Sequence, residues 1–230
     1  MAMVMISTQV NELELGNFEG QLTQTVVLSN ISWLTYQAML ADMGEHRSTR
    51  IAYNQGILSL KMPSKLHEII NRLLARIVKT LTEELDLEVV DVGSMTLERE
   101  DLKQGAEPDT GFYIQNAIQL EGLDPEISEH LPPDLVIEVD ITSPSGHRME
   151  IYAALGISEV WRYTKRRGLV IYHLAMEHYE ESDTSAAFPM VKTEQLNEFL
   201  IQRQTQSENQ VIRRVRNWVQ QQSGTNVKAG

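Results

Sequence analysis

The chain has no cysteine among its 230 residues. Disulfides and thiolate metal sites are therefore excluded, so any bound metal ion must use oxygen or imidazole ligands. Oxygen ligands favour hard cations such as Mg²⁺, Mn²⁺ or Ca²⁺. The chain also lacks an apolar run of about 18 residues, which a membrane-spanning helix needs. Residues 1–16 show neither the basic start nor the apolar stretch of a signal peptide. The simplest expectation is a cytoplasmic protein that does not enter the membrane.

Positive charge is scarce as well. The chain has 20 Lys and Arg residues against 32 Asp and Glu residues, which gives a formal net charge of −12. Proteins that bind nucleic acid tightly and without sequence preference normally present a basic surface, because their affinity comes largely from neutralising phosphates. The composition argues against such a binder. It permits an enzyme that meets phosphates through bound cations and a few local Arg and Lys residues.

Internal repeats are missing, and no linker rich in Gly, Ser or Pro marks a domain boundary. Hydrophobic residues make up 42% of the chain, which suffices for a proper core, so intrinsic disorder is not expected. We predict a single domain over residues 1–222, with its core at about 49–174 and a flexible tail at 223–230. Two C-terminal helices are expected at 193–203 and 208–221.

Hydrophobic periodicity, capping residues and turn residues predict an alternation of helices and strands. The clearest element is a helix that Pro63 and Ser64 open and that ends near Glu84, because its apolar residues recur on one face. The other expected elements are a helix from Trp33 to about Met43 capped by Ser32, a hairpin with its turn at Asn54–Gly56, a short helix at 148–155, and a hairpin with its turn at 165–168. This mixture predicts an α/β fold.

The strongest strand signal is the segment DLVIEVDIT, which starts at Asp134 and lies between Pro-Pro and Ser-Pro-Ser-Gly. Side chains alternate between the two faces of a strand, so Asp134, Glu138 and Asp140 share one face with Val136. Carboxylates inside a sheet are costly unless they are paired or bind a cation. The pattern alone leaves two interpretations open: a central strand that carries a metal site, or an edge strand whose polar face meets water.

Further acidic candidates lie upstream. Glu107-Pro108-Asp109 opens a short predicted strand, and Glu68 lies in the first turn of the long helix. In isolation, Glu68 is better explained as a carboxylate that is favoured near a helix N-terminus. The neighbouring His67 is a weaker candidate, because such a histidine is more often packed or solvated than a ligand.

Basic residues gather at two places. Lys165, Arg166 and Arg167 lie in a predicted hairpin turn, which indicates either a solvated turn or a phosphate contact. The last helix carries arginines beside an apolar stripe, and this stripe packs either on the domain or on a second subunit. The second alternative predicts a homodimer through the C-terminal helices.

Three linked segments resemble the Uma-two family of endonucleases, which is abundant in cyanobacteria and belongs to the PD-(D/E)XK restriction-endonuclease-like superfamily. They are EPD at 107–109, PPDLVIEVDITSPS at 132–145 and YAALGISEVWRY at 152–163. The similarity extends over more than half of the chain, from roughly Thr49 to Leu174. It implies a restriction-endonuclease-like fold, in which a mixed central sheet is flanked by helices. An N-terminal hairpin and the C-terminal helices are additions to that core.

The resemblance also implies a site. In the superfamily, a helix glutamate, a strand aspartate and an acidic residue on the next strand hold one or two divalent metal ions. The resemblance assigns these places to Glu68, Asp109 and Glu138, with Mg²⁺ or Mn²⁺ as the cofactor. The implied function is metal-dependent hydrolysis of phosphodiester bonds in DNA, because a bound metal ion lowers the pKa of water and neutralises charge on the phosphate.

This chain departs from the superfamily pattern at the lysine. Two residues after Glu138 stands Asp140, which is either an additional metal ligand or a partner for Arg148. Many relatives place a lysine four residues before the tyrosine that Tyr152 matches, and here that residue is Arg148. Arginine binds phosphate but is too basic to deprotonate water at neutral pH, so its expected catalytic role is charge stabilisation or substrate orientation. If this is the displaced lysine position, Arg148→Lys should raise activity.

Three functions stay open on the sequence alone. The first is the metal-dependent nuclease. The second is a catalytically impaired nuclease-fold protein that acts as a binding or regulatory module, which the missing lysine and the negative net charge both favour. The third is hydrolysis of another substrate, such as a glycoside, by the same carboxylates. No aromatic-lined sugar cleft is recognisable in the sequence to support the third.

Overall fold

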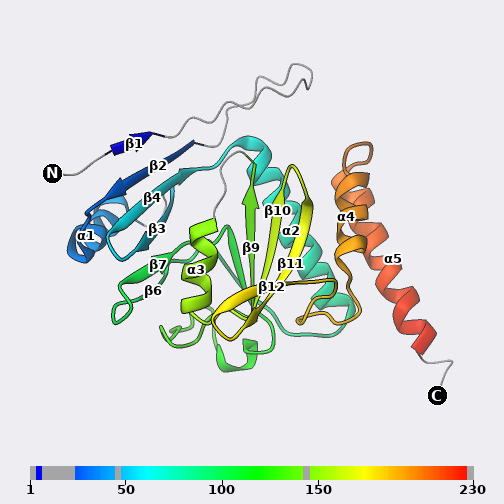
Figure 1. Cartoon of the computed structure of the whole chain (residues 1–230). Coiled ribbons are helices and arrows are strands. Elements are labelled where there is room, and N and C mark those ends of the chain that lie inside the picture. Colours follow the sequence, from blue (N-terminus) through cyan, green and yellow to red (C-terminus); the bar gives the residue numbers. More distant parts are fainter. Residues whose placement is uncertain (1–3, 7–23, 45–47, 142–145, 227–230) are drawn as a thin grey trace.

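The computed structural model describes residues 4–6, 24–44, 48–141 and 146–226. Its strands form two six-stranded sheets (Figure 1). The N-terminal sheet contains β1 (Val4–Ile6), β2 (Gln24–Ser29), β3 (Arg50–Asn54), β4 (Ile57–Met62), β6 (Leu97–Arg99) and β7 (Gln104–Ala106). The central sheet contains β5 (Val90–Gly93), β8 (Thr110–Tyr113), β9 (Leu135–Asp140), β10 (Glu159–Thr164), β11 (Gly168–Ala175) and β12 (His178–Ser182). The helices are α1 (Trp33–Met43), α2 (Lys65–Glu84), the short 3₁₀ helix η1 (Ala117–Gln119), α3 (Gly146–Ala154), α4 (Thr193–Gln202) and α5 (Glu208–Asn226).

The N-terminal sheet is built on the predicted hairpin, whose strands β3 and β4 pair antiparallel. Gln55 and Gly56 in its turn have φ angles of 45° and 102°. Tight hairpins need this left-handed region, and glycine adopts it without strain. Neighbouring strands extend the pair to the order β1-β2-β4-β3-β7-β6. Ser32 caps α1 as predicted, and Trp33 packs this helix on the sheet.

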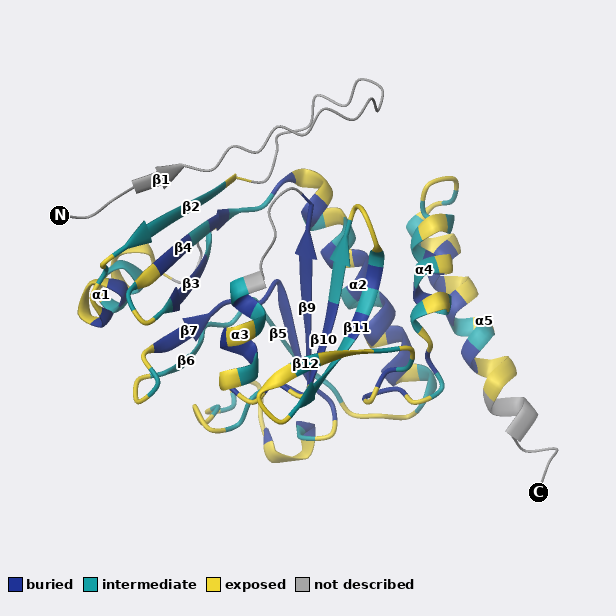
Figure 2. Cartoon of the chain, in the orientation of Figure 1, coloured by how far each residue is buried: buried dark blue, intermediate teal, exposed yellow. Residues whose placement is uncertain are grey.

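In the central sheet, β9 is an internal strand, which decides between the two interpretations of its sequence. The order is β12-β11-β10-β9-β8-β5, and β9 pairs parallel with β10 and antiparallel with β8. The crossover that parallel neighbours need contains α3. All residues of β9 are buried (Figure 2), so its carboxylates require partners. A mixed central sheet with flanking helices confirms the predicted fold class.

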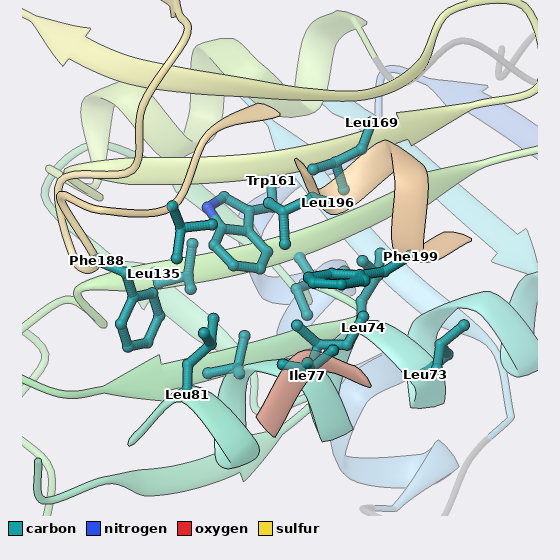
Figure 3. Close-up of a cluster of buried hydrophobic side chains, with 14 of the residues drawn as sticks. Leu73, Leu74, Ile77, Leu81, Leu135, Trp161, Leu169, Phe188, Leu196 and Phe199 are labelled. Carbon is teal, nitrogen blue, oxygen red and sulfur yellow. The ribbon is translucent and has the colours of Figure 1, made fainter. Parts of the chain in front are cut away.

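Alternate residues of β9 face two different cores. Leu135 and Ile137 pack with α2, α4 and α5 in the larger core, part of which is drawn in Figure 3. Val136 faces the opposite side and packs with Ile151 of α3. The helices α2 and α3 therefore cover opposite faces of the central sheet (Figure 1). Glu138 has the same parity as Val136, and this places its side chain on the α3 side.

The two C-terminal helices complete the larger core. They form where helices were predicted at 193–203 and 208–221, and α5 extends to Asn226. The apolar stripe of α5, which includes Val215, packs on the domain itself. Packing on the domain was one of the two alternatives, and packing on a second subunit was the other. A homodimer through these helices stays a prediction. The predicted tail at 223–230 overlaps the end of α5 and otherwise lies outside the described residues. Among the residues that the structure describes, no helix is long and apolar enough to cross a membrane.

Candidate active site

Three buried carboxylates from β9 and the segment before β8 surround the ammonium group of Lys61. The Nζ atom lies 2.6 Å from Oε1 of Glu138 and 3.5 Å from Oδ2 of Asp109. It lies 3.6 Å from Oδ1 of Asp140 and donates a hydrogen bond of 3.0 Å to the carbonyl of Val139. Lys61 belongs to β4 of the N-terminal sheet, so the cluster joins the two sheets.

Backbone pairing fixes the position of Asp109. Its N–H donates to the carbonyl of Ile137 at 3.1 Å, and its Oδ2 accepts a hydrogen bond of 2.7 Å from the N–H of Val139. Burial alone would raise the pKa of this carboxyl. The positive charge of Lys61, together with the hydrogen bond from the N–H of Val139, outweighs that effect and holds the pKa of Asp109 well below its usual range. Asp109 therefore carries a negative charge at neutral pH.

Glu138 is held by side chains from both sides. Its Oε1 faces Lys61, and its Oε2 accepts a hydrogen bond of 2.7 Å from the hydroxyl of Tyr152. The guanidinium of Arg148 lies 3.8 Å from the same Oε2. Arg148 and Tyr152 are one turn apart on α3, so this short helix supplies both contacts. Burial and the charge of Glu138 raise the pKa of Tyr152, so its phenol stays protonated and acts as the donor.

Asp140 faces a third cation, Arg162 on the adjacent strand β10. The Nε and Nη2 atoms of Arg162 both lie 2.8 Å from Oδ2 of Asp140. The parallel pairing of β9 with β10 places Arg162 opposite Glu138, within reach of Asp140 two residues along the strand. Together, three cationic side chains (Lys61, Arg148 and Arg162) meet the three carboxylates in one buried ionic cluster.

Sequence analysis missed Arg162 of this cluster, and it also missed the cation nearest Glu138, Lys61. Its side chain is 3% exposed. Burial disfavours the charged form, but the carboxylates of Asp109 and Glu138 more than compensate and raise the pKa of Lys61. The residue is therefore an ammonium ion at neutral pH. The available signal was a lysine in the apolar run ILSLKM, on the same face of β4 as the buried Ser59, because lysine is almost never fully buried unless it is paired.

The sequence model of the Uma2 family, described as "Putative restriction endonuclease", matches residues 33–204, which is more than half of the chain. The chain belongs to the Uma2 family. A similar solved structure is that of "a putative nuclease belonging to DUF820" from Anabaena variabilis. It is 14% identical to this chain with a TM-score of 0.51, and the match covers 73% of this chain and 98% of that one. This likeness supports the fold. No curated protein matches the chain.

Glu68, the helix glutamate that the family resemblance assigns to the metal site, lies at the start of α2. Its side chain is 33% exposed, and its oxygens lie 3.8 Å from Arg50 and 3.7 Å from Arg72. The preceding residue, His67, lies against the cluster, with its Nε2 atom 2.9 Å from Oδ1 of Asp109. Consecutive helix residues point about 100° apart, which explains why the two side chains have different surroundings.

The donor atoms of this Uma2 site have the chemistry that a divalent cation requires. Carboxylate oxygens are the ligands that hard cations prefer. In addition, Oδ1 of Asp109 and both ring nitrogens of His67 are buried without a hydrogen-bond partner. Within the described ranges, however, no three Asp, Glu or His side chains are close enough together to hold one ion. Metal binding by three such ligands therefore requires side chains around Lys61 to shift.

Arg148 is buried against backbone carbonyls. Its guanidinium donates hydrogen bonds to the carbonyl of Glu107 at 2.8 Å and to the carbonyl of Arg50 at 3.4 Å. These contacts tie α3 to β3 and to the segment before Asp109. Because Lys61 already places an ammonium beside Glu138, the structure changes what we expect of Arg148→Lys.

We now expect Arg148→Lys to lower stability without raising activity. Lysine keeps the charge but lacks the planar fork that reaches two carbonyls. Each buried acceptor left without its donor costs about 1–3 kcal/mol. Urea unfolding of the native protein and the variant measures the loss, with Arg213→Lys on the exposed side of α5 as the control. Higher DNA nicking at unchanged stability would show instead that position 148 takes the displaced lysine.

Two other charged candidates have structural partners. The carboxylate of Glu107 accepts hydrogen bonds of 2.8 Å from the N–H of Ile51 and from the hydroxyl of Thr96. Arg167, in the predicted basic turn, makes two hydrogen bonds of 2.6 Å with the carboxylate of Glu181. These contacts pair the charged or polar atoms of both side chains, so neither residue needs a metal ion or a phosphate as a partner.

Proposed function

We propose that this Uma2 protein hydrolyses phosphodiester bonds in DNA with the help of a divalent cation, Mg²⁺ or Mn²⁺. The observation that carries the proposal is the distance of 2.6 Å between Nζ of Lys61 and Glu138, with Asp109 3.5 Å from the same ammonium. An aspartate, a glutamate and a lysine thus lie together, as the superfamily motif requires. The lysine comes from β4 rather than from the strand that carries the glutamate.

Each residue has a distinct role in this proposal. Asp109 and Glu138 are the principal metal ligands, and Asp140 and Glu68 are additional candidates. A bound cation offsets negative charge on the scissile phosphate and makes water more acidic. Lys61 adds a compact positive charge beside Glu138, suited to donate a hydrogen bond to a phosphate oxygen. Arg148 holds Glu138 from α3 and adds positive charge on that side of the cluster.

A second candidate function is a nuclease-fold module that binds or regulates without catalysis. Two observations favour it. Three cationic side chains balance the three carboxylates, so the cluster is close to neutral without a metal ion. The side chains of Asp109 and Glu138 are both 0% exposed, as in an ionic cluster that only stabilises the fold.

A titration with Mn²⁺, followed by calorimetry, separates the two candidates. The nuclease proposal predicts saturable binding to the native protein. Asp109→Asn removes a direct ligand and should weaken that binding by about tenfold or more. Loss of a residue that only supports a metal ligand already costs about tenfold. Asp124→Asn, in an exposed loop, is the matched control, and circular dichroism checks the fold of both variants. Native protein that takes up no Mn²⁺ would favour the non-catalytic module.

A further inference from the structure

His67 is a fully buried histidine, and both of its ring nitrogens lack a hydrogen-bond partner. Its Nε2 atom lies 2.9 Å from Oδ1 of Asp109, an oxygen that also has no hydrogen-bond partner. The two atoms are close enough for a hydrogen bond, but they do not have the geometry of one. A proton or metal ion bound to Nε2 therefore lies off the straight line between Nε2 and Oδ1.

The rest of the structure holds these two side chains in place. His67 lies in the first turn of α2, where its backbone N–H donates to the capping hydroxyl of Ser64 at 3.3 Å. Asp109 is fixed by the hydrogen bond from the N–H of Val139 to its other carboxylate oxygen, Oδ2. Buried polar atoms without partners are costly and rare in folded proteins. A ligand shared by Nε2 and Oδ1 would satisfy both atoms.

The separation of the two atoms fits a shared metal ion. Two ligands that bind one cation at about 2.1 Å in neighbouring positions are about 3 Å apart. The observed 2.9 Å between Nε2 and Oδ1 matches this value. We infer that His67 is a metal ligand alongside Asp109, an inference that rests on the proposed metal-dependent function. The site then contains one imidazole nitrogen in addition to its carboxylate oxygens.

A nitrogen ligand changes which metal ion the site prefers. Imidazole suits transition ions such as Co²⁺ and Zn²⁺, whereas Mg²⁺ prefers oxygen ligands and keeps much of its water. The native protein should therefore bind Co²⁺ more tightly than Mg²⁺. This preference should depend on His67, while the carboxylates contribute to the binding of both ions.

The test uses the full chain without an affinity tag, titrated separately with Co²⁺ and Mg²⁺. His67→Gln should weaken Co²⁺ binding by about tenfold or more, because a direct ligand is lost, and should leave Mg²⁺ binding nearly unchanged. His130→Gln removes an imidazole from an exposed position and is the matched control. Pulsed electron paramagnetic resonance of the Mn²⁺-loaded native protein should detect a histidine nitrogen coupled to the metal, and this coupling should vanish in His67→Gln.

The outcomes separate this inference from the proposed function. Equal Co²⁺ affinity of the native protein and a folded His67→Gln would overturn the inference, as would a native spectrum without nitrogen coupling. If Asp109→Asn weakens Co²⁺ binding and His67→Gln does not, the carboxylate site stands without the histidine. A native protein that binds none of the three metal ions would contradict both the inference and the proposed function. If His67→Gln does not fold, the nitrogen coupling of the native protein decides the question.

Discussion

Replacing Lys61 with methionine is expected to lower the free energy of unfolding by about 3–5 kcal/mol. The Lys61 side chain is 3% exposed, and its ammonium lies within 3.6 Å of three buried carboxylates. Methionine fills a similar volume but leaves these carboxylates with two arginines as their remaining cationic partners in the cluster. Removing one partner from a buried ionic cluster leaves an uncompensated charge, and this costs far more than losing a pair at the surface.

Urea unfolding measures this loss against a matched control. Lys79 pairs with Asp91 at 2.5 Å, but its side chain is 51% exposed. Lys79→Met should therefore cost no more than about 1 kcal/mol. Divalent cations give a second readout, because Mg²⁺ that binds the unneutralised carboxylates should stabilise Lys61→Met more than it stabilises the native protein. A Lys61→Met variant as stable as the native protein would show that the ionic cluster contributes nothing to folding.

The elements that sequence analysis placed correctly have local signals. The helix α2 has a capping Ser64 and an apolar stripe at helical spacing, and it forms over Lys65–Glu84 with that stripe in the larger core. The two faces of β9 follow from alternation alone, so the side on which Glu138 lies could be predicted. Whether β9 lies inside the sheet or at its edge could not be predicted, because that depends on which strands pair with it.

The site itself was only partly predictable, because its contacts join distant parts of the chain. Asp109, Glu138 and Asp140 were all selected, and the structure places them around one ammonium. The lysine that carries this ammonium is 77 residues before Glu138 and belongs to the other sheet. No local pattern at Lys61 specifies that contact, because it depends on how the hairpin packs against β9.

The start of α2 gives a second example of the same limit. Sequence analysis ranked Glu68 above His67, because a histidine in such a position is more often packed or solvated than a ligand. The structure brings the histidine to 2.9 Å from Asp109, while the glutamate lies near two arginines. The choice between consecutive residues depends on how the helix is rotated about its own axis against the sheet. Hydrophobic periodicity determines that rotation only to within the width of the apolar stripe.

The claim that this site cuts DNA is tested most directly by nicking of supercoiled plasmid in the presence of Mg²⁺ or Mn²⁺. The native protein should nick the plasmid with either ion, and nicking should stop when the ion is chelated. Glu138→Gln keeps the shape of the side chain but removes its charge, and it should lower the rate by about 100-fold or more. Glu150→Gln makes the same change at an exposed position of α3 and should leave the rate unchanged. If Glu138→Gln does not fold, Asp109→Asn takes its place. Nicking that persists in a folded site variant, nicking that needs no metal ion, or a native protein that does not nick would each contradict the account.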